Sequence, residues 1–135
     1  MKKIFADTFY WAALLNPKDQ WYEAAKAAQQ KLGQVRLVTT ETVLIELLNF
    51  FSEYGAEMRQ TVVNTVRDVL VGLDIEYISH SPESFLDALD FYEKRLDKGY
   101  SLTDCVSMLT MKNFDAREIL THDNHFAQEG FTILL

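Results

Sequence analysis

The chain has 135 residues, 48% of them hydrophobic and 13% aromatic, and its net charge is −7. A chain of this size and composition is expected to fold as one globular domain over residues 1–135, because it can bury roughly two-thirds of its unfolded surface. The acidic balance argues against a broad basic face for nucleic acid. Two bound divalent cations would change the charge from −7 to −3 and weaken that objection.

The absence of a long apolar segment and the single cysteine narrow the cellular compartment and the class of protein further. No apolar run approaches the ~20 residues that cross a bilayer, and the start of the chain lacks the apolar segment of a signal peptide. The single cysteine, Cys105, allows no internal disulfide and no cysteine-rich zinc site. It stands within an apolar helical pattern and is interpreted as a small core residue. These features predict a cytoplasmic protein without a membrane segment.

The first half of the chain alternates between strand and helix patterns. A short strand at 4–6 precedes an aromatic helix at 9–15, and Asn16-Pro17 is typical of the start of a helix, here over 18–32 with Gly33 as its end. A strand at 35–38 leads to a helix that Thr39 or Thr40 caps and that runs to about residue 54, with Gly55 as its stop. A further helix is expected at about 57–70.

The second half continues the alternation. A strand at 75–78 is followed by a helix that Ser81-Pro82 opens and that ends near Gly99, and Ser101 starts a helix to about residue 114. Strands at 118–121 and 131–134 complete the chain. Strands separated by helices predict an α/β three-layer sandwich, with a central, mostly parallel sheet of about five strands flanked by helices.

Four acidic residues occupy positions that could converge in such a fold. Asp7 follows the first strand, Asp123 follows the fourth, Asp104 starts a helix, and Glu46 lies on the polar stripe of another helix. Ligands of parallel sheets gather beyond the carboxyl ends of the strands, where the chain order reverses. Carboxylates crowded together repel one another, and a divalent metal ion is the usual remedy. The pattern indicates metal-dependent chemistry on phosphate esters.

Each of these acids also has a purely structural interpretation. Asp7 could cap the following helix, and Asp123 could be a turn residue. Glu46 could belong to a solvated helix face. Ser101-Leu102-Thr103-Asp104 fits a capping box, in which the acid returns a hydrogen bond to the cap residue. Taken one at a time, the acids do not decide between structure and function.

Other residues near these acids leave alternatives open. His122 and His125 could bind Zn²⁺ or Mn²⁺ together with Asp123, although packing or loop hydrogen bonding is the favoured role. A phosphohydrolase of the HD type would need more metal-binding histidines and aspartates, and His80 is the only other histidine. Four bases lie close to Asp104 in sequence and either serve the site or are solvated helix charges: Lys94, Arg95, Lys98 and Lys112.

Aromatic residues are concentrated in the first 54 positions. Most of them are expected in the core, and any that stay exposed would form an apolar surface suited to a partner or a second copy. They are Phe9, Tyr10, Trp11, Trp21, Tyr22, Phe50, Phe51 and Tyr54.

Taken together, the motifs resemble a known family. Asp7-Thr8, Glu46, the stretch SLTDC at 101–105 and the stretch LTHDNHF at 120–126 resemble the PIN-domain ribonucleases, in particular the VapC-like toxins of type II toxin–antitoxin systems. The resemblance covers essentially the whole chain. It implies that four acids are the catalytic and metal-binding residues, namely Asp7, Glu46, Asp104 and Asp123. It also implies supporting positions for Thr8, Thr103 and Asp97.

The resemblance implies a Mg²⁺- or Mn²⁺-dependent endoribonuclease that hydrolyses RNA, leaving a 5′-phosphate and a 3′-hydroxyl. It further implies a homodimer and a small antitoxin protein across the active-site groove. A PIN-like binding module without catalysis and a DNA nuclease with the same site are the alternatives. A response-regulator receiver is disfavoured, because Asp7 has no acidic neighbour and no Lys follows the last strand.

Overall fold

The computed structural model describes all 135 residues and contains a single five-stranded sheet. The strands lie in the order β3-β2-β1-β4-β5, and every neighbouring pair is parallel. They are β1 (Lys2–Ala6), β2 (Val35–Thr40), β3 (Ile75–Ile78), β4 (Glu118–Leu120) and β5 (Thr132–Ile133). The predicted α/β class with a central sheet is confirmed, and the sheet is entirely rather than mostly parallel.

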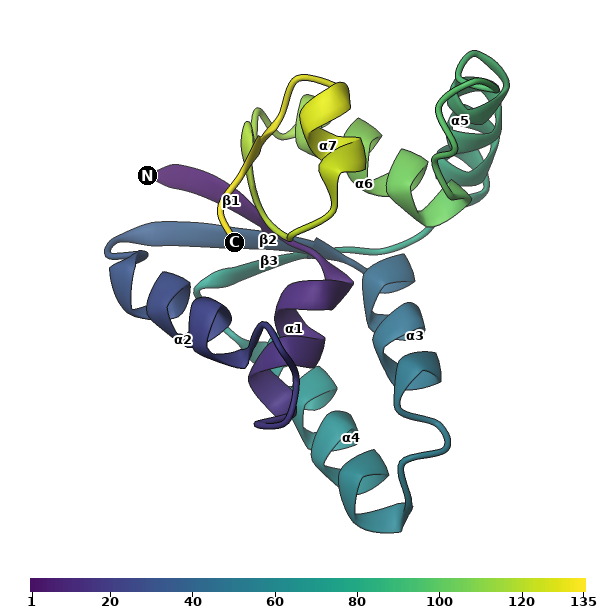
Figure 1. Cartoon of the computed structure of the whole chain (residues 1–135). Coiled ribbons are helices and arrows are strands. Elements are labelled where there is room, and N and C mark those ends of the chain that lie inside the picture. Colours follow the sequence, from purple (N-terminus) through teal and green to yellow (C-terminus); the bar gives the residue numbers. More distant parts are fainter.

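Seven helices cover the two faces of this sheet. The helices are α1 (Thr8–Leu15), α2 (Tyr22–Lys31), α3 (Glu41–Phe50), α4 (Ala56–Val71), α5 (Pro82–Glu93), α6 (Leu102–Asn113) and α7 (Asn124–Gln128). Figure 1 shows α1 to α4 on one side of the strands and α5 to α7 on the other. None of the helices has the length and apolar character needed to cross a membrane.

The central strands are apolar because helices cover both of their faces. Phe5 and Ala6 of β1 and Ile119 and Leu120 of β4 are fully buried. The core continues into the helices through large buried side chains, among them Tyr10, Leu47, Phe51, Met108, Met111 and Phe126. Cys105 is also buried and free, as the sequence predicted, and burial raises the pKa of its thiol to about 11.

Several predicted helix ends differ from the structure. Helix α2 begins at Tyr22 rather than at residue 18, because the side chain of Asn16 accepts from the backbone N–H of Lys18, and that of Asp19 from Trp21. Such local side-chain bonds give the backbone an alternative to the helix. Helices α3 and α5 also end earlier than expected, at Phe50 and Glu93, and continue as turns.

Helix α7 was not predicted. The structural alternative for Asp123 was a turn residue, but its carboxylate caps a five-residue helix by accepting from the backbone N–H of His125 at 2.9 Å. A helix this short carries too little periodicity to stand out in the sequence.

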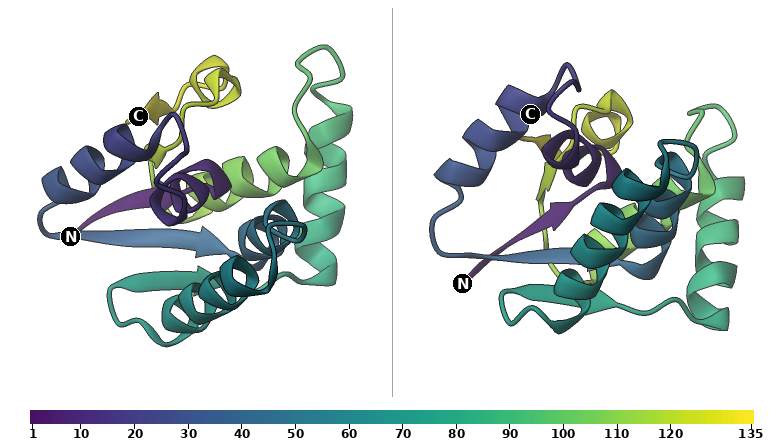
Figure 2. Two further views of the ribbon diagram at one scale, coloured as in Figure 1. Left: turned by 60° about the horizontal axis from the view of Figure 1, so that its bottom comes forward. Right: turned by 90° about the horizontal axis from the view of Figure 1, so that it is seen from below.

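The strand order places a crevice between β1 and β4. From β1 the chain adds β2 and β3 on one side and later returns to add β4 and β5 on the other, so the direction of winding reverses at this pair. Ala6 pairs with Leu120, which brings the residues after both strands to the same edge. In both views of Figure 2 the N-terminus lies at the far end of the molecule from α5. Crevices of this kind are where parallel sheets bind ligands.

Candidate active site

Asp7 lies at the bottom of this crevice. It occupies the N-cap position of α1, as the structural interpretation predicted, but its side chain makes no capping hydrogen bond. Instead its Oδ2 accepts a 2.9 Å hydrogen bond from the hydroxyl of Thr121, the residue that follows β4. Asp7 is only 4% exposed. Burial raises the pKa of its carboxyl to about 7, and the charges of Asp104 and Glu46 add to this effect.

Asp104 enters the site from the first turn of α6. The predicted capping box is present: Ser101 Oγ accepts from the Asp104 N–H at 3.0 Å, and Asp104 Oδ2 accepts from the Ser101 N–H at 3.1 Å. These bonds fix the carboxylate and leave its other oxygen without a hydrogen bond. Burial raises the pKa of Asp104, and the nearby charge of Asp123 acts in the same direction. The structural and functional interpretations of this residue are therefore compatible.

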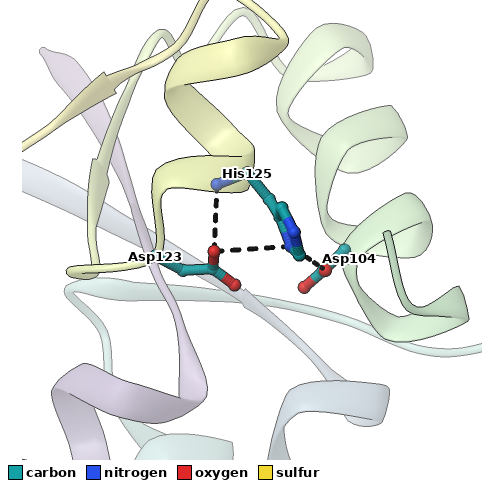
Figure 3. A group of neighbouring side chains, drawn as sticks. All are labelled: Asp104, Asp123 and His125. Atoms are coloured by element: carbon teal, nitrogen blue, oxygen red, sulfur yellow. Dashed lines mark hydrogen bonds and ion pairs between the residues drawn. The ribbon is translucent and has the colours of Figure 1, made fainter. Parts of the chain in front are cut away.

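His125 stands between two of the acids. Figure 3 shows its ring between Asp104 of α6 and Asp123 at the start of α7. Nδ1 lies 3.4 Å from Asp104 Oδ2 and 3.4 Å from Asp123 Oδ1. Ligand atoms of these three side chains lie within 4.8 Å of one another, which is a spacing that one metal ion could bridge. Sequence analysis favoured packing or loop hydrogen bonding for His125, with metal contact as the alternative, and the hydrogen bonds to Asp123 and Asp104 agree with the second of the favoured roles. The contact with Asp104 was not foreseen.

His122 has a different environment. Its ring packs between Trp21, with centroids 4.4 Å apart and planes 9° from parallel, and Phe9, with centroids 4.5 Å apart. The favoured packing role is thus what the structure shows for this histidine.

A cavity of about 290 Å³ joins these residues. Its lining includes all four predicted acids, with Glu46 reaching it from the exposed face of α3. The other lining residues are Thr8, Phe9, Phe50, Gly99, Ser101 and His125. Asp7, which follows β1, thus meets residues of α1, α3, α6 and α7 in one water-accessible crevice.

Two supporting residues suggested by the sequence lie elsewhere. The carboxylate of Asp97 is 78% exposed and pairs with Lys98 at 3.8 Å, and neither Asp97 nor Thr103 lines the cavity. Thr8 does line it and is 4% exposed. The hydroxyl of Thr8 is buried and has no hydrogen-bond partner.

None of the four predicted bases lines the cavity either. Arg95 and Lys112 are directed to Glu129, which accepts two hydrogen bonds from Arg95 at 2.9 and 3.0 Å. Tyr100 donates to the same carboxylate at 3.1 Å. These contacts lower the pKa of Glu129 to about 2, with the Arg95 bond as the largest cause. Two of the bases close to Asp104 in sequence are therefore engaged in a neighbouring network, and none of the four lines the cavity.

The donor set fits a divalent cation. Asp7 and Asp104 are desolvated, all four acids line one cavity, and no lysine or arginine lines the cavity to offset their charge. Carboxylate oxygens are the ligands of hard ions such as Mg²⁺, and an imidazole nitrogen also suits Mn²⁺. Asp7, with a carboxyl pKa of about 7, would release its proton more readily beside a bound cation.

The family model described as PIN domain matches residues 4–131. The chain belongs to the PIN-domain family. This confirms the resemblance seen in the sequence. The match spans all of the residues that line the candidate active site. No curated protein matches the sequence significantly.

Solved structures share the fold of this PIN domain. VapC20 of Mycobacterium tuberculosis, a toxin that cleaves the sarcin–ricin loop, superposes with a TM-score of 0.85 at 21% identity, over 96% of each chain. VapBC2 of Rickettsia felis, bound to a DNA fragment from its promoter, gives 0.66 at 13% identity over 97% of this chain and 96% of that one. FitAcB of Neisseria gonorrhoeae gives 0.62 at 16% identity over 98% and 96%. At these identities the likeness establishes the fold alone.

Proposed function

We propose that this protein is a metal-dependent endoribonuclease and the toxin of a toxin–antitoxin pair, with residues 1–135 forming one PIN domain. The observation that carries the proposal is the convergence of four acids from distant parts of the chain on one cavity at the β1–β4 crevice. They are Asp7, Glu46, Asp104 and Asp123. The fold shared with a toxin that cleaves the sarcin–ricin loop supports it.

In the proposed mechanism, Asp7 and Asp104 are the principal ligands of a Mg²⁺ or Mn²⁺ ion. The Thr121 hydroxyl holds Asp7, and the capping box holds Asp104, so both carboxylates are fixed before substrate binds. Glu46 and Asp123 complete the coordination or hold water that does. When bound, such an ion supplies an activated water and offsets the charge of the phosphate. Attack by water predicts a 5′-phosphate and a 3′-hydroxyl on the products.

Two protein partners belong to the proposal. An antitoxin laid across the acidic groove would silence the enzyme by covering the four carboxylates. A second copy would cover the exposed apolar stripe along α5, whose residues are spaced to share one helix face. The stripe consists of Phe85, Leu86, Leu89, Tyr92 and, just beyond the helix, Leu96, which are 42–75% exposed.

The test is cleavage of a mixed RNA substrate by purified, partner-free protein with Mg²⁺, with Mn²⁺ and with EDTA. Asp104→Asn is compared with the matched control Asp97→Asn, because Asp97 is an acid outside the cavity. We expect metal-dependent cleavage that Asp104→Asn abolishes and Asp97→Asn retains. Folded protein that cleaves neither RNA nor DNA would favour a silent binding module. Products ending in 2′,3′-cyclic phosphate would refute the water-attack mechanism.

A further inference from the structure

Two exposed aromatic rings stand beside the carboxylates. Phe9, from the first turn of α1, is 39% exposed, and Phe50, at the end of α3, is 43% exposed. Both line the same cavity as the four acids. Phe50 follows Glu46 by four residues, so the two side chains share one face of α3. Large apolar rings exposed to water beside a charged crevice are costly unless a ligand covers them.

Each of these two rings packs against other aromatic side chains of the protein. Phe9 packs on His122, and His122 stacks on Trp21, so the three aromatic rings pack in series at the edge of the site. Phe50 packs edge-on against the buried Phe51, with centroids 4.9 Å apart, and beside Tyr54 at 6.0 Å. A ring held in this way loses little conformational entropy when a flat ligand stacks on it.

The net charge of the protein indicates which part of a nucleic acid the site can bind. With a net charge of −7 and no lysine or arginine lining the cavity, a nucleic acid gains little from its phosphate backbone here. Affinity beyond what a bound cation gives one phosphate must therefore come from the bases. Stacking of a base on an aromatic side chain contributes ~1–3 kcal/mol and tolerates any sequence, but it requires bases that are unstacked, as in single strands and loops.

We propose that Phe9 and Phe50 form a base-stacking subsite, which binds unpaired nucleobases next to the phosphodiester held at the carboxylates. The inference rests on the proposed nuclease function, because it takes single-stranded RNA as the occupant of the cavity. It adds that the protein selects its substrate by strand state: unpaired segments bind, and continuous duplex does not. The rings would thereby supply affinity that lysines and arginines supply where such residues line a nucleic-acid site.

The experiment measures binding apart from cleavage. A fluorescein-labelled, single-stranded RNA octamer of mixed sequence is titrated with Asp104→Asn protein in Mg²⁺, and fluorescence anisotropy is recorded. An abasic ribose-phosphate octamer and a duplex of the same sequence are the comparison probes. The variants, built on Asp104→Asn, are Phe9→Leu, Phe50→Leu and Phe9→Trp. Phe114→Leu is the matched control, because Phe114 lies with Lys3 in a separate pocket at the opposite end of β1.

We expect the single-stranded octamer to bind at least about fivefold more tightly than the abasic or duplex probe, the lower end of the stacking range. Phe9→Leu and Phe50→Leu should each remove about fivefold or more of that affinity. Phe9→Trp should retain it, and Phe114→Leu should leave it unchanged. Melting followed by circular dichroism verifies that each variant is folded.

Equal affinity for the base-bearing and abasic octamers, or no loss in either Phe→Leu variant, would overturn the inference. Rings that bind only a protein partner would give this result. The two proposals fail separately. Metal-dependent cleavage with base-independent binding would leave the nuclease and remove the stacking subsite. Base-dependent binding without any cleavage would leave the subsite and remove the nuclease.

Discussion

The hydroxyl of Thr121 donates a 2.9 Å hydrogen bond to Oδ2 of Asp7, joining the residues that follow β4 and β1. Both residues are buried, at 0% and 4% exposure. The bond holds the most desolvated carboxylate of the site in one orientation, and it opposes the rise in the pKa of Asp7 that burial causes. A buried hydroxyl here therefore contributes to stability and to the electrostatics of the site at once.

Replacing this hydroxyl tests its role. Thr121→Val keeps the shape but leaves Asp7 without its partner, so we expect the free energy of unfolding to fall by ~1–3 kcal/mol. Metal affinity should fall by roughly 10–100-fold, as is usual when the partner of a ligand is lost. Denaturant titration and isothermal calorimetry with Mn²⁺ measure the two effects. Thr121→Ser, which keeps the hydroxyl, is the control, and equal affinity in Val and Ser variants would contradict the argument.

Asp7 makes the stability of the metal-free protein depend on pH. Its carboxyl has a pKa of about 7 in the folded protein against 3.8 in the unfolded chain, so the folded state binds the proton more tightly. The stability that this proton binding contributes is complete below pH 3.8 and is lost as pH rises through 7. The loss is at most about 4 kcal/mol, at 1.36 kcal/mol per pKa unit.

Asp7→Asn removes this titration. In EDTA, the variant should be more stable than the wild type at pH 8, and the advantage should disappear near pH 4. Added Mg²⁺ should stabilise the wild type at pH 8 and have little effect on Asp7→Asn. Thermal melts across this pH range provide the measurement, and parallel pH profiles for the two proteins would show that Asp7 is not protonated as described.

Ser101 offers a test with an internal control, since α5 and α6 begin with the same capping box. Ser101→Ala and Ser81→Ala should each lower the free energy of unfolding by ~1 kcal/mol. Ser101→Ala keeps the Ser101 N–H that holds the Asp104 carboxylate but removes the hydroxyl that accepts from the Asp104 N–H. It therefore loosens the helix turn that carries Asp104, and only this variant should slow metal-dependent cleavage. A comparable loss of activity in both variants would attribute the effect to general destabilisation.

Glu129 is expected to matter for stability. Glu129→Gln weakens the contacts to Arg95 and Tyr100, and we expect a loss on the order of 2 kcal/mol, the range for hydrogen bonds to charged groups. The pKa of Glu129 is about 2 in the folded protein and 4.5 in the unfolded chain, so its contribution is present above pH 4.5 and is lost as pH falls toward 2. Denaturant titrations at pH 7 and pH 3 test this, with the exposed Glu53→Gln as control.

The apolar stripe on α5 predicts the state of association. Leu89, 46% exposed at its centre, would lie against the same helix of a second copy. Leu89→Glu should convert a dimer into a monomer of 15.6 kDa, because it buries two like charges at a two-fold interface. Sedimentation equilibrium measures the mass. A wild-type protein that is monomeric at high micromolar concentration would refute the proposed homodimer.

The order of strands and helices followed from the sequence, and all five strands lie within about two residues of their predicted ends. Hydrophobic periodicity and caps are local signals, and Thr40, Ser81 and Ser101 indeed cap the helices that follow them. Helix α7 was not predicted because five residues are too few to show a helical periodicity. Helix α2 begins later than predicted because the side chains of Asn16 and Asp19 accept hydrogen bonds from the nearby backbone.

The four acids were identified from the sequence through their family resemblance, but their convergence depends on strand order. Only the tertiary structure shows that β4 lies beside β1, and hence that Thr121 reaches Asp7. The same holds for His125, which lies two residues after Asp123 in sequence but becomes a site residue by facing Asp104. The spacing along the chain did not show whether Lys112 or Asp97 would face the cavity, and in the structure neither residue lines it.

The amino-acid sequence by itself determined the α/β architecture, the positions of the candidate carboxylates and the burial of Cys105, because these depend on local pattern and residue chemistry. The tertiary structure decided which side chains share the crevice, that Glu129 engages two of the four nearby bases, and that Phe9 and Phe50 stay exposed beside the acids. Contacts between residues more than a hundred positions apart depend on how strands are ordered and helices packed, and a local pattern does not contain that information.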